Sequence, residues 1–256
     1  MHQAKKWFGQ NFLKDRSVLE KIIQSMPDGA QAHVEIGPGL GDLTERLILK
    51  GVLTAVEIDE QLCVYLRDKF KDAIHSQRLN LVCGDVLKRW ESQESLIPEP
   101  YDLVANLPYY VATNIILRAL DDPMCQHLVV MVQKEVAQKF AATVGKREYG
   151  ALAVLAQDTG NARLLFDVPP EAFDPVPKVV SAVLRIDKDK EKTDPGLSRL
   201  LRIAFAQPRK TLRKNLLTGY PEDQVDGLFN ALELPPQVRP HQVPVDLFRQ
   251  LAPGAV

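Results

Sequence analysis

Residues 33–42 read HVEIGPGLGD, an apolar stretch of strand length that runs directly into a glycine-rich turn. Glycine has no β-carbon, so glycines in such a turn let a ligand approach the backbone closely. In open α/β sheets, ligands bind outside the carboxyl ends of the strands, which is where this turn would lie. The stretch therefore predicts a strand, a tight turn and a helix, with a ligand site at the turn. A purely structural turn is the alternative.

The glycine spacing narrows the class of ligand. Gly37, Gly39 and Gly41 follow the pattern G-x-G-x-G. Dinucleotide sites use G-x-G-x-x-G, and phosphate-binding loops need a following Lys-Ser/Thr pair that is absent here. A nicotinamide dehydrogenase is disfavoured by this spacing and by the lack of a hydride-site His or Tyr-Lys pair.

On either side of residues 33–42, short apolar runs alternate with segments whose apolar residues recur at the spacing of a helix. Strands are expected at residues 33–37, 53–59, 79–83, 101–105, 127–133, 163–168 and 179–186, and helices at 42–50, 60–70, 134–140 and 149–158. Continuous Val/Leu/Ile runs are typical of parallel strands covered on both faces. We expect a doubly wound α/β fold whose seven-stranded, mostly parallel sheet ends in an antiparallel edge hairpin. Asp42 is placed to cap the first helix.

The composition changes at residues 187–196 (DKDKEKTDPG), a charged segment that ends in Pro-Gly and is typical of a linker. Beyond it, helical patterns occupy 197–206, 209–217, 222–232 and 244–251, with no good strand. The sequence thus predicts an α/β domain over residues 1–188 and a small all-helical domain over 189–256.

Composition excludes several classes of protein. The chain has 256 residues, 45% of them hydrophobic and 25% charged, as in ordinary soluble domains. No apolar run approaches the ~20 residues that span a bilayer, and the N-terminus lacks the apolar core of a secretory signal. Cys63, Cys83 and Cys125 show no metal-type spacing, and their odd number argues against a disulfide framework. We expect a cytoplasmic protein with no metal and no membrane partner.

The net charge of −1 conceals an uneven distribution. Phosphates are met by local basic patches rather than by the total charge. Residues 199–214 contain six basic side chains and no acidic one: Arg199, Arg202, Arg209, Lys210, Arg213 and Lys214. This stretch favours a nucleic-acid partner, and a solvated helix face is the alternative.

Acidic side chains follow the second and third expected strands. Glu57 is placed where a carboxylate accepts hydrogen bonds from both ribose hydroxyls of a nucleoside. Asp85 can accept from an adenine amino group while the backbone N–H of Val86 meets a ring nitrogen. A helix N-cap is the alternative for Asp85. With the glycine turn, the two acids predict a clamp for adenosine.

The fourth expected strand ends in Asn106-Leu107-Pro108-Tyr109. Methylation of an exocyclic amine requires its nitrogen lone pair to be freed from the ring. The Asn106 side-chain carbonyl and the Leu107 main-chain carbonyl can accept its two N–H groups. Pro108 fixes the backbone, and Tyr109 offers a flat face for the target base. An ordinary Asn-x-Pro turn is the alternative.

In order along the chain, these motifs resemble those of the small-subunit (16S) ribosomal RNA adenine N6,N6-dimethyltransferases, which belong to the Rossmann-like class I methyltransferases. The resemblance covers nearly the whole length. It rests on residues 8–13 (FGQNFL), 35–41 (EIGPGLG), 56–59 (VEID), 106–109 (NLPY), 133–136 (QKEV), 173–179 (FDPVPKV) and 209–216 (RKTLRKNL).

The resemblance implies S-adenosylmethionine as the methyl donor, with no metal. Its site would be lined by Asn11, Leu13, Gly37, Glu57, Asp85, Val86 and Asn106, the first two folding over the methionine end. Phe173 would stack on the target base opposite Tyr109, although a core position is the alternative. The helical domain would bind RNA through Arg202, Arg209, Lys210, Arg213 and Lys214.

The family places two methyl groups on each of two adjacent adenosines in a hairpin loop near the 3′ end of 16S RNA, as the small subunit matures. The partner would be the immature small ribosomal subunit, and nothing indicates an obligate dimer, so we expect a monomer. A loop-exposed base suits this chemistry because duplex stacking hides N6. Two residues depart from the family pattern: Ala105 stands where glycine is frequent, and Tyr110 where a second asparagine is common.

Three relatives of the fold are alternatives. A large-subunit RNA adenine methyltransferase that confers antibiotic resistance fits residues 173–179 and 209–216 less well. A DNA adenine methyltransferase usually carries an acid at the Asn106 position. A non-catalytic transcription factor would not need the intact adenosine clamp.

Overall fold

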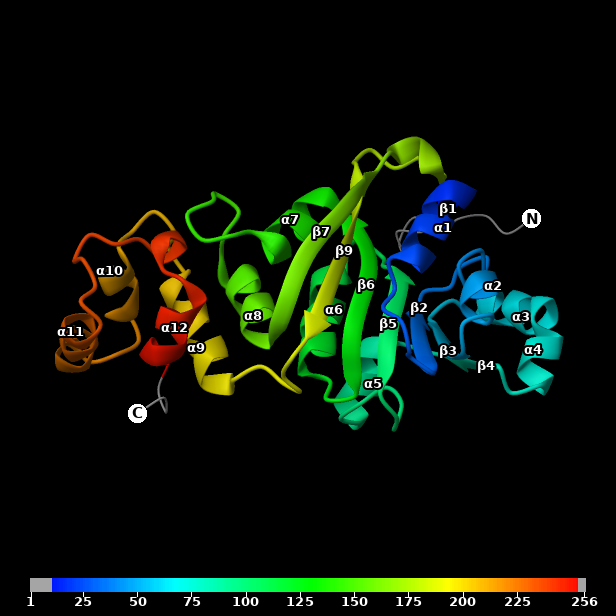
Figure 1. The fold of residues 1–256 in the computed structure, drawn as a ribbon, viewed down its shortest axis with the longest axis horizontal. Helices are drawn as coiled ribbons and strands as arrows, with labels where there is room; N and C mark the ends of the chain where they lie inside the picture. Colours follow the sequence, from blue (N-terminus) through cyan, green and yellow to red (C-terminus); the bar gives the residue numbers. More distant parts are fainter. Residues whose placement is uncertain (1–10, 253–256) are drawn as a thin grey trace.

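A mixed seven-stranded sheet forms the centre of the fold, with the strand order β4-β3-β2-β5-β6-β9-β7 (Figure 1). The computed structural model describes residues 11–252. The strands span Ala32–Ile36 (β2), Val52–Glu57 (β3), Leu79–Cys83 (β4), Tyr101–Asn106 (β5), Cys125–Gln133 (β6), Gly160–Val168 (β7) and Ser181–Lys188 (β9). Neighbours from β4 to β6 are parallel, whereas β9 runs antiparallel to both β6 and β7. The predicted α/β sheet with its antiparallel edge is confirmed.

Helices cover both faces of this sheet. They span Arg16–Gln24 (α1), Thr44–Leu47 (α2), Glu60–Lys69 (α3), Lys71–His75 (α4), Val86–Ser92 (α5), Ala112–Asp121 (α6), Lys134–Ala141 (α7) and Ala151–Thr159 (α8). Successive side chains of a strand point to opposite faces of the sheet and belong to different buried clusters. In β5, Leu103 packs with α5 and α6, whereas Val104 packs with α1 and α3. Burial on both faces explains why the strands are continuous apolar runs.

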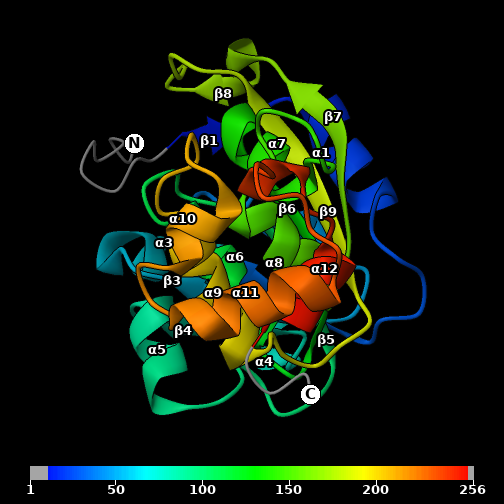
Figure 2. The same cartoon turned by 90° about the vertical axis from the view of Figure 1, so that its left-hand side faces the viewer.

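The C-terminal part of the chain is helical. Its helices span Pro195–Ala204 (α9), Leu212–Leu216 (α10), Glu222–Ala231 (α11) and Val245–Leu251 (α12), with a 3₁₀ turn at Pro240–Gln242. Figure 2 views the molecule from this end and shows the helices in front of the sheet. They share a third buried cluster with Tyr149 and Val154, next to and within α8. Within residues 11–252, no helix is long and apolar enough to cross a membrane.

A short strand pair joins two distant parts of the chain near the carboxyl edge of the sheet. Strand β1 (Phe12–Leu13) pairs antiparallel with β8 (Phe173–Asp174), which follows a 3₁₀ turn at Pro170–Ala172. The N–H groups of Lys14 and Asp15 also donate to the Ala172 carbonyl. Sequence patterns did not predict this pair, because each strand is too short to show a period.

Two expectations are corrected by the structure. Cys63 and Cys83 form a disulfide with a Cα–Cα distance of 6.1 Å, whereas no disulfide was expected. The register of β3 and β4 places Cys83 beside Glu57. Helix α3 begins shortly after Glu57 and carries Cys63, so the two cysteines meet although they lie far apart in the sequence. Cys125 is free and buried.

Asp42 does not cap α2, because the N-cap of this helix is Leu43. The Asp42 carboxylate instead accepts a hydrogen bond from Lys14 Nζ at 2.7 Å.

Candidate active site

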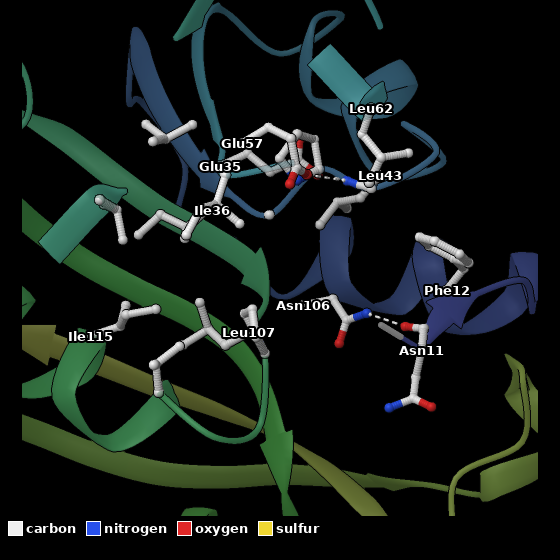
Figure 3. A pocket seen from close by; sticks show the side chains of 18 of the residues that line it. Asn11, Phe12, Glu35, Ile36, Leu43, Glu57, Leu62, Asn106, Leu107 and Ile115 are labelled. Atoms are coloured by element: carbon white, nitrogen blue, oxygen red, sulfur yellow. Dashed lines mark hydrogen bonds between the residues drawn. The ribbon is translucent and has the colours of Figure 1, made fainter. Parts of the chain in front are cut away.

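A cavity lies at the carboxyl ends of β2, β3, β4 and β5, beneath the segment that contains β1 (Figure 3). Its lining includes nearly all the site residues predicted from the sequence: Asn11, Leu13, Gly37, Glu57, Asp85, Val86, Asn106, Leu107, Pro108 and Tyr109. Parallel strands carry their C-terminal residues to a common edge, so residues almost a hundred positions apart meet here.

The glycine-rich turn forms one wall of the cavity. Gly39 and Gly41 have φ values of 61° and 82°, in the left-handed region that glycine adopts without strain. A β-carbon on Gly39 would lie 3.0 Å from the Phe12 ring, and one on Gly41 would lie 2.5 Å from the Phe70 ring. The turn therefore requires glycine for its backbone conformation and for close packing.

Glu57 links this turn to the tip of β3. Its side chain is 3% exposed, and its two carboxylate oxygens accept from the Gly39 N–H at 3.2 Å and the Asp59 N–H at 2.9 Å. Burial raises the pKa of Glu57, and these backbone hydrogen bonds oppose that rise. A carboxylate has about four lone-pair sites, so acceptor positions remain for ribose hydroxyls.

Asp85 has a structural contact and also lines the cavity. One carboxylate oxygen accepts from the Leu87 N–H at 2.9 Å and caps α5, as the structural alternative predicted. The second oxygen makes no hydrogen bond with any residue in the described range 11–252. The two roles are compatible, because capping orients the side chain and leaves one oxygen to accept from a ligand.

Asn106 is held by the segment that covers the cavity. Its Nδ2 donates to the Asn11 main-chain carbonyl at 3.0 Å, an interaction drawn in Figure 3. Because this bond uses the donor end of the amide, the Oδ1 end is left as an acceptor. Among the described residues, the Leu107 carbonyl also accepts no hydrogen bond. The turn thus offers two carbonyl oxygens suited to an amine.

Tyr109 is anchored from the opposite side. Its hydroxyl hydrogen-bonds with the Ser181 Oγ at 2.7 Å, and Ser181 is fully buried at the start of β9. Burial raises the pKa of Tyr109, so the phenol is neutral at ordinary pH. The ring is therefore fixed at its far end while its face borders the cavity.

Glu35 was not among the predicted site residues, although it lines the cavity. It is 2% exposed and accepts from Thr44 Oγ1 at 2.6 Å. Burial, together with the neighbouring carboxylate of Glu57, raises its pKa to about 8. Its place at the start of the glycine turn was the available sequence signal. Figure 3 shows Glu35 and Glu57 close together above the cavity.

Phe173, which the sequence analysis expects to stack on the target base, does not line the cavity in this structure. Its side chain is 3% exposed and belongs to the buried cluster that contains Leu13 and Val168. Pairing of β8 with β1, which sets Phe173 opposite Leu13, places this side chain in the core. The structural alternative for Phe173 is the one observed.

The basic residues of the helical part differ in their surroundings. Arg202, Arg209, Lys210 and Lys214 are exposed and form no ion pair within residues 11–252. Arg213 is different, because it contacts Glu222 Oε1 and Asp226 Oδ1, each at 2.7 Å. These acids raise its pKa and occupy its guanidinium, so Arg213 has a structural contact that the sequence did not predict.

A second cavity lies where the helical part meets the loop before α8. Arg147, Arg209, Arg239 and His241 line it together with the aromatic rings of Tyr149 and Phe205, and Glu148 is its acidic residue. In the described part of the chain, no group of three or more His, Cys, Asp or Glu side chains is arranged to hold a metal ion.

Solved structures share this architecture. The 23S rRNA methyltransferase ErmE superimposes with a TM-score of 0.72 at 24% identity, covering 94% of this chain and 98% of that one. A dimethyladenosine transferase from Plasmodium falciparum gives a TM-score of 0.78 at 22% identity, covering 93% and 95%. The strand order and the cavity at the carboxyl edge are those of the Rossmann-like class I methyltransferase fold.

Sequence comparison then identifies the family. Residues 1–252 match the ribosomal RNA adenine dimethylase family, and the chain belongs to it. The chain is 51% identical over 248 residues to ribosomal RNA small subunit methyltransferase A of Sulfurimonas denitrificans, covering 97% of this chain and 92% of the relative. The protein of that name from Aliarcobacter butzleri is 48% identical over 251 residues, covering 97% and 95%. The resemblance found in the motifs is confirmed, and the chain is a methyltransferase of this family.

Proposed function

We propose that this enzyme transfers methyl groups from S-adenosylmethionine to N6 of two adjacent adenosines in a hairpin loop near the 3′ end of 16S rRNA. The product would be N6,N6-dimethyladenosine, formed as the small subunit matures. The names of the relatives, which specify the small subunit, support this substrate. The observation that carries the proposal is the Asn106 amide, whose oxygen is left free as an acceptor by its bond to Asn11.

The cavity suits S-adenosylmethionine by its chemistry. Buried carboxyl groups at Glu35 and Glu57 suit a ligand that carries hydroxyls. Glu57 would accept from the ribose hydroxyls, and Asp85 and the Val86 N–H would contact the adenine. Asn11, Leu13 and Gly37 would border the methionine end. When bound, the cofactor supplies a methyl group activated by its sulfonium.

The protein contributes position and electrostatics. The Asn106 oxygen and the Leu107 carbonyl would accept both N–H groups of the acceptor amine and free its lone pair for in-line attack. Pro108 fixes the turn, and Tyr109, held by Ser181, would set the plane of the base. No strong base is needed, because the methylated ammonium product is acidic. Phe173 has no part in this arrangement.

We place RNA binding on the helical part and the groove beside it. The exposed Arg202, Arg209, Lys210 and Lys214 would contact phosphates. The second cavity extends this basic surface through Arg147, Arg239 and His241. Residues 1–188 would thus perform the chemistry and residues 189–256 would hold the substrate. We further propose that the enzyme acts as a monomer in the cytoplasm, where immature ribosomal subunits are found.

The test is methyl transfer from labelled S-adenosylmethionine to small ribosomal subunits that lack these methyl groups, followed by digestion to nucleosides. We expect labelled N6,N6-dimethyladenosine at two adjacent positions. Large subunits serve as the control, because label in their RNA instead would support the large-subunit alternative. Absence of label in either subunit, despite cofactor binding, would contradict the proposal.

A further inference from the structure

Tyr109 and Tyr110 are adjacent in the turn after β5 but lie in different surroundings. The turn is closed by a hydrogen bond from the Val111 N–H to the Pro108 carbonyl at 3.2 Å. Tyr109 reaches Ser181 on β9, which lies beyond β6 on one side of β5. Tyr110 lines the cavity together with Glu57 and Asp85, two acids that lie at the carboxyl ends of β3 and β4, on the other side of β5. The two rings therefore border opposite halves of the cavity.

Tyr110 shares the cavity with Glu57 and Asp85. Burial raises the pKa of its hydroxyl, and the negative charges of Asp85 and Glu57 raise it further. Those are the carboxylates to which the proposed function assigns the adenosine of the cofactor. The Tyr110 side chain also lines the cavity itself. It consequently borders the cofactor half of the site, whereas Tyr109 borders the acceptor half.

Tyr110 is exposed to solvent although it lines the cavity. Its side chain is 57% exposed, although it lines a cavity whose other large apolar groups are mostly buried. A single exposed tyrosine on a turn is common and needs no function. Tyr65 on α3 is such a case, since it is 43% exposed, lies outside the cavity and contacts the Lys69 ammonium. Tyr110 differs because a flat ligand bound between Glu57 and Asp85 would lie within its reach.

We propose that Tyr110 is a cofactor-binding residue whose ring covers the adenine of S-adenosylmethionine, and that it sets the affinity for the cofactor in this chain. This inference rests on the proposed function. An aromatic face stabilises a purine by stacking, and loss of one such contact commonly weakens binding about ten-fold. Asparagine, by contrast, is too small to cover a purine.

The experiment measures ligand affinity by calorimetry for the full chain and its variants. The ligands are S-adenosylhomocysteine and 5′-methylthioadenosine, which share the adenosine and differ in the amino-acid end. We expect Tyr110→Ala and Tyr110→Asn to weaken both ligands by about ten-fold and by the same factor. Tyr110→Phe should stay within about two-fold of the original protein, because stacking needs the ring and not the hydroxyl. Tyr65→Ala is the matched control and should change neither affinity.

Kinetics on small ribosomal subunits complete the test. Tyr110→Ala should raise the KM for S-adenosylmethionine about ten-fold and leave the KM for subunits within about two-fold of the original value. A raised KM for subunits with unchanged ligand affinity would assign Tyr110 to the RNA and overturn the inference. Weaker binding of S-adenosylhomocysteine alone would assign it to the methionine end, with the same consequence. Failure of the original protein to bind either ligand would instead contradict the proposed function, whatever residue occupies position 110.

Discussion

The cavity at the carboxyl edge and the basic stretch of the helical part hold their polar groups in different ways. In the cavity, Glu57 and Asn106 are fixed by backbone partners from other segments of the chain. In the basic stretch, Arg209 and Lys210 project into solvent with no ion pair within residues 11–252. Arg213 resembles the cavity residues instead, because two acids hold it.

This difference separates two kinds of function. A methyl transfer requires atoms to be placed within a fraction of an ångström, and buried partners provide that placement. Binding to a phosphate backbone requires positive charge near a surface, and mobile exposed side chains provide it additively. A cation that is already paired with carboxylates binds a phosphate more weakly. Changes in the two regions should therefore differ in size and in kind.

The largest effect is expected from Asn106→Ala. This change removes the acceptor oxygen from the cavity, and we expect kcat to fall on the order of 10²-fold or more. Affinity for S-adenosylhomocysteine should change much less, because Glu57 and Asp85 remain. Single-turnover transfer and calorimetry measure the two quantities. The control is Asn114→Ala, an exposed asparagine on nearby α6. Near-normal turnover in Asn106→Ala would remove this residue from the mechanism.

Glu35 provides a test through pH. Burial raises its pKa to about 8 from an ordinary value of 4.5. The folded protein thus holds a proton that the unfolded chain has lost between these pH values, so stability falls as pH rises through this window. Glu35→Gln keeps an acceptor for Thr44 and does not titrate. We expect its stability, relative to the original protein, to rise on the order of 5 kcal/mol across the window.

Urea unfolding of ligand-free protein at several pH values measures this difference. Asp102 and Glu57 also titrate with raised pKa values, and comparing the two proteins at each pH cancels their contribution. Parallel stability curves for the two proteins would show that Glu35 is ionised in the folded state at neutral pH.

Arg209 and Arg213 distinguish free cations from paired ones. We expect Arg209→Ala with Lys210→Ala to weaken binding to small subunits about ten-fold at moderate salt and to lower the salt slope by about two. Arg213→Ala should leave the slope nearly unchanged and lower thermal stability slightly, since it breaks contacts with Glu222 and Asp226. Filter binding over a range of salt concentrations measures the slopes. An equal loss of slope in both variants would mean that Arg213 releases its acids to bind RNA.

The smallest effect on catalysis is expected from Phe173→Leu. Because Phe173 lies in the core, this substitution should cost less than about 1.5 kcal/mol of stability and leave kcat within about two-fold. Chemical denaturation and steady-state kinetics measure the two effects. A large loss of kcat with little loss of stability would return Phe173 to the acceptor site.

The sequence predicted the central sheet closely, because each strand carries its own local pattern. The expected strand at 79–83 is β4 as observed, and the expected strand at 101–105 is one residue shorter than β5. The cavity residues were also found, since strand tips in a parallel sheet converge by topology alone. Glu35 was missed because it stands inside an apolar strand, and its place just before the glycine turn was the only local sign that it lines the site.

The features that the sequence did not predict depend on contacts between residues far apart in the chain. The pairing of β1 with β8 decides that Phe173 faces the core, and it joins segments about 160 positions apart in the chain. The partners of Arg213 lie on α11, and only the packed helices bring them together. The disulfide between Cys63 and Cys83 likewise depends on the register of β3 and β4. None of these contacts has a sequence period that a linear analysis detects.

The hydrogen bond between Asn106 and the Asn11 carbonyl has a consequence for the timing of catalysis. The segment that carries Asn11 also covers the cavity through Phe12 and is latched to β8. Any opening of that segment wide enough to exchange a spent cofactor also releases the Asn106 amide to rotate. Such an opening would couple loading of the donor to alignment of the acceptor. An enzyme that must add several methyl groups to one substrate would reset its acceptor site each time it is recharged.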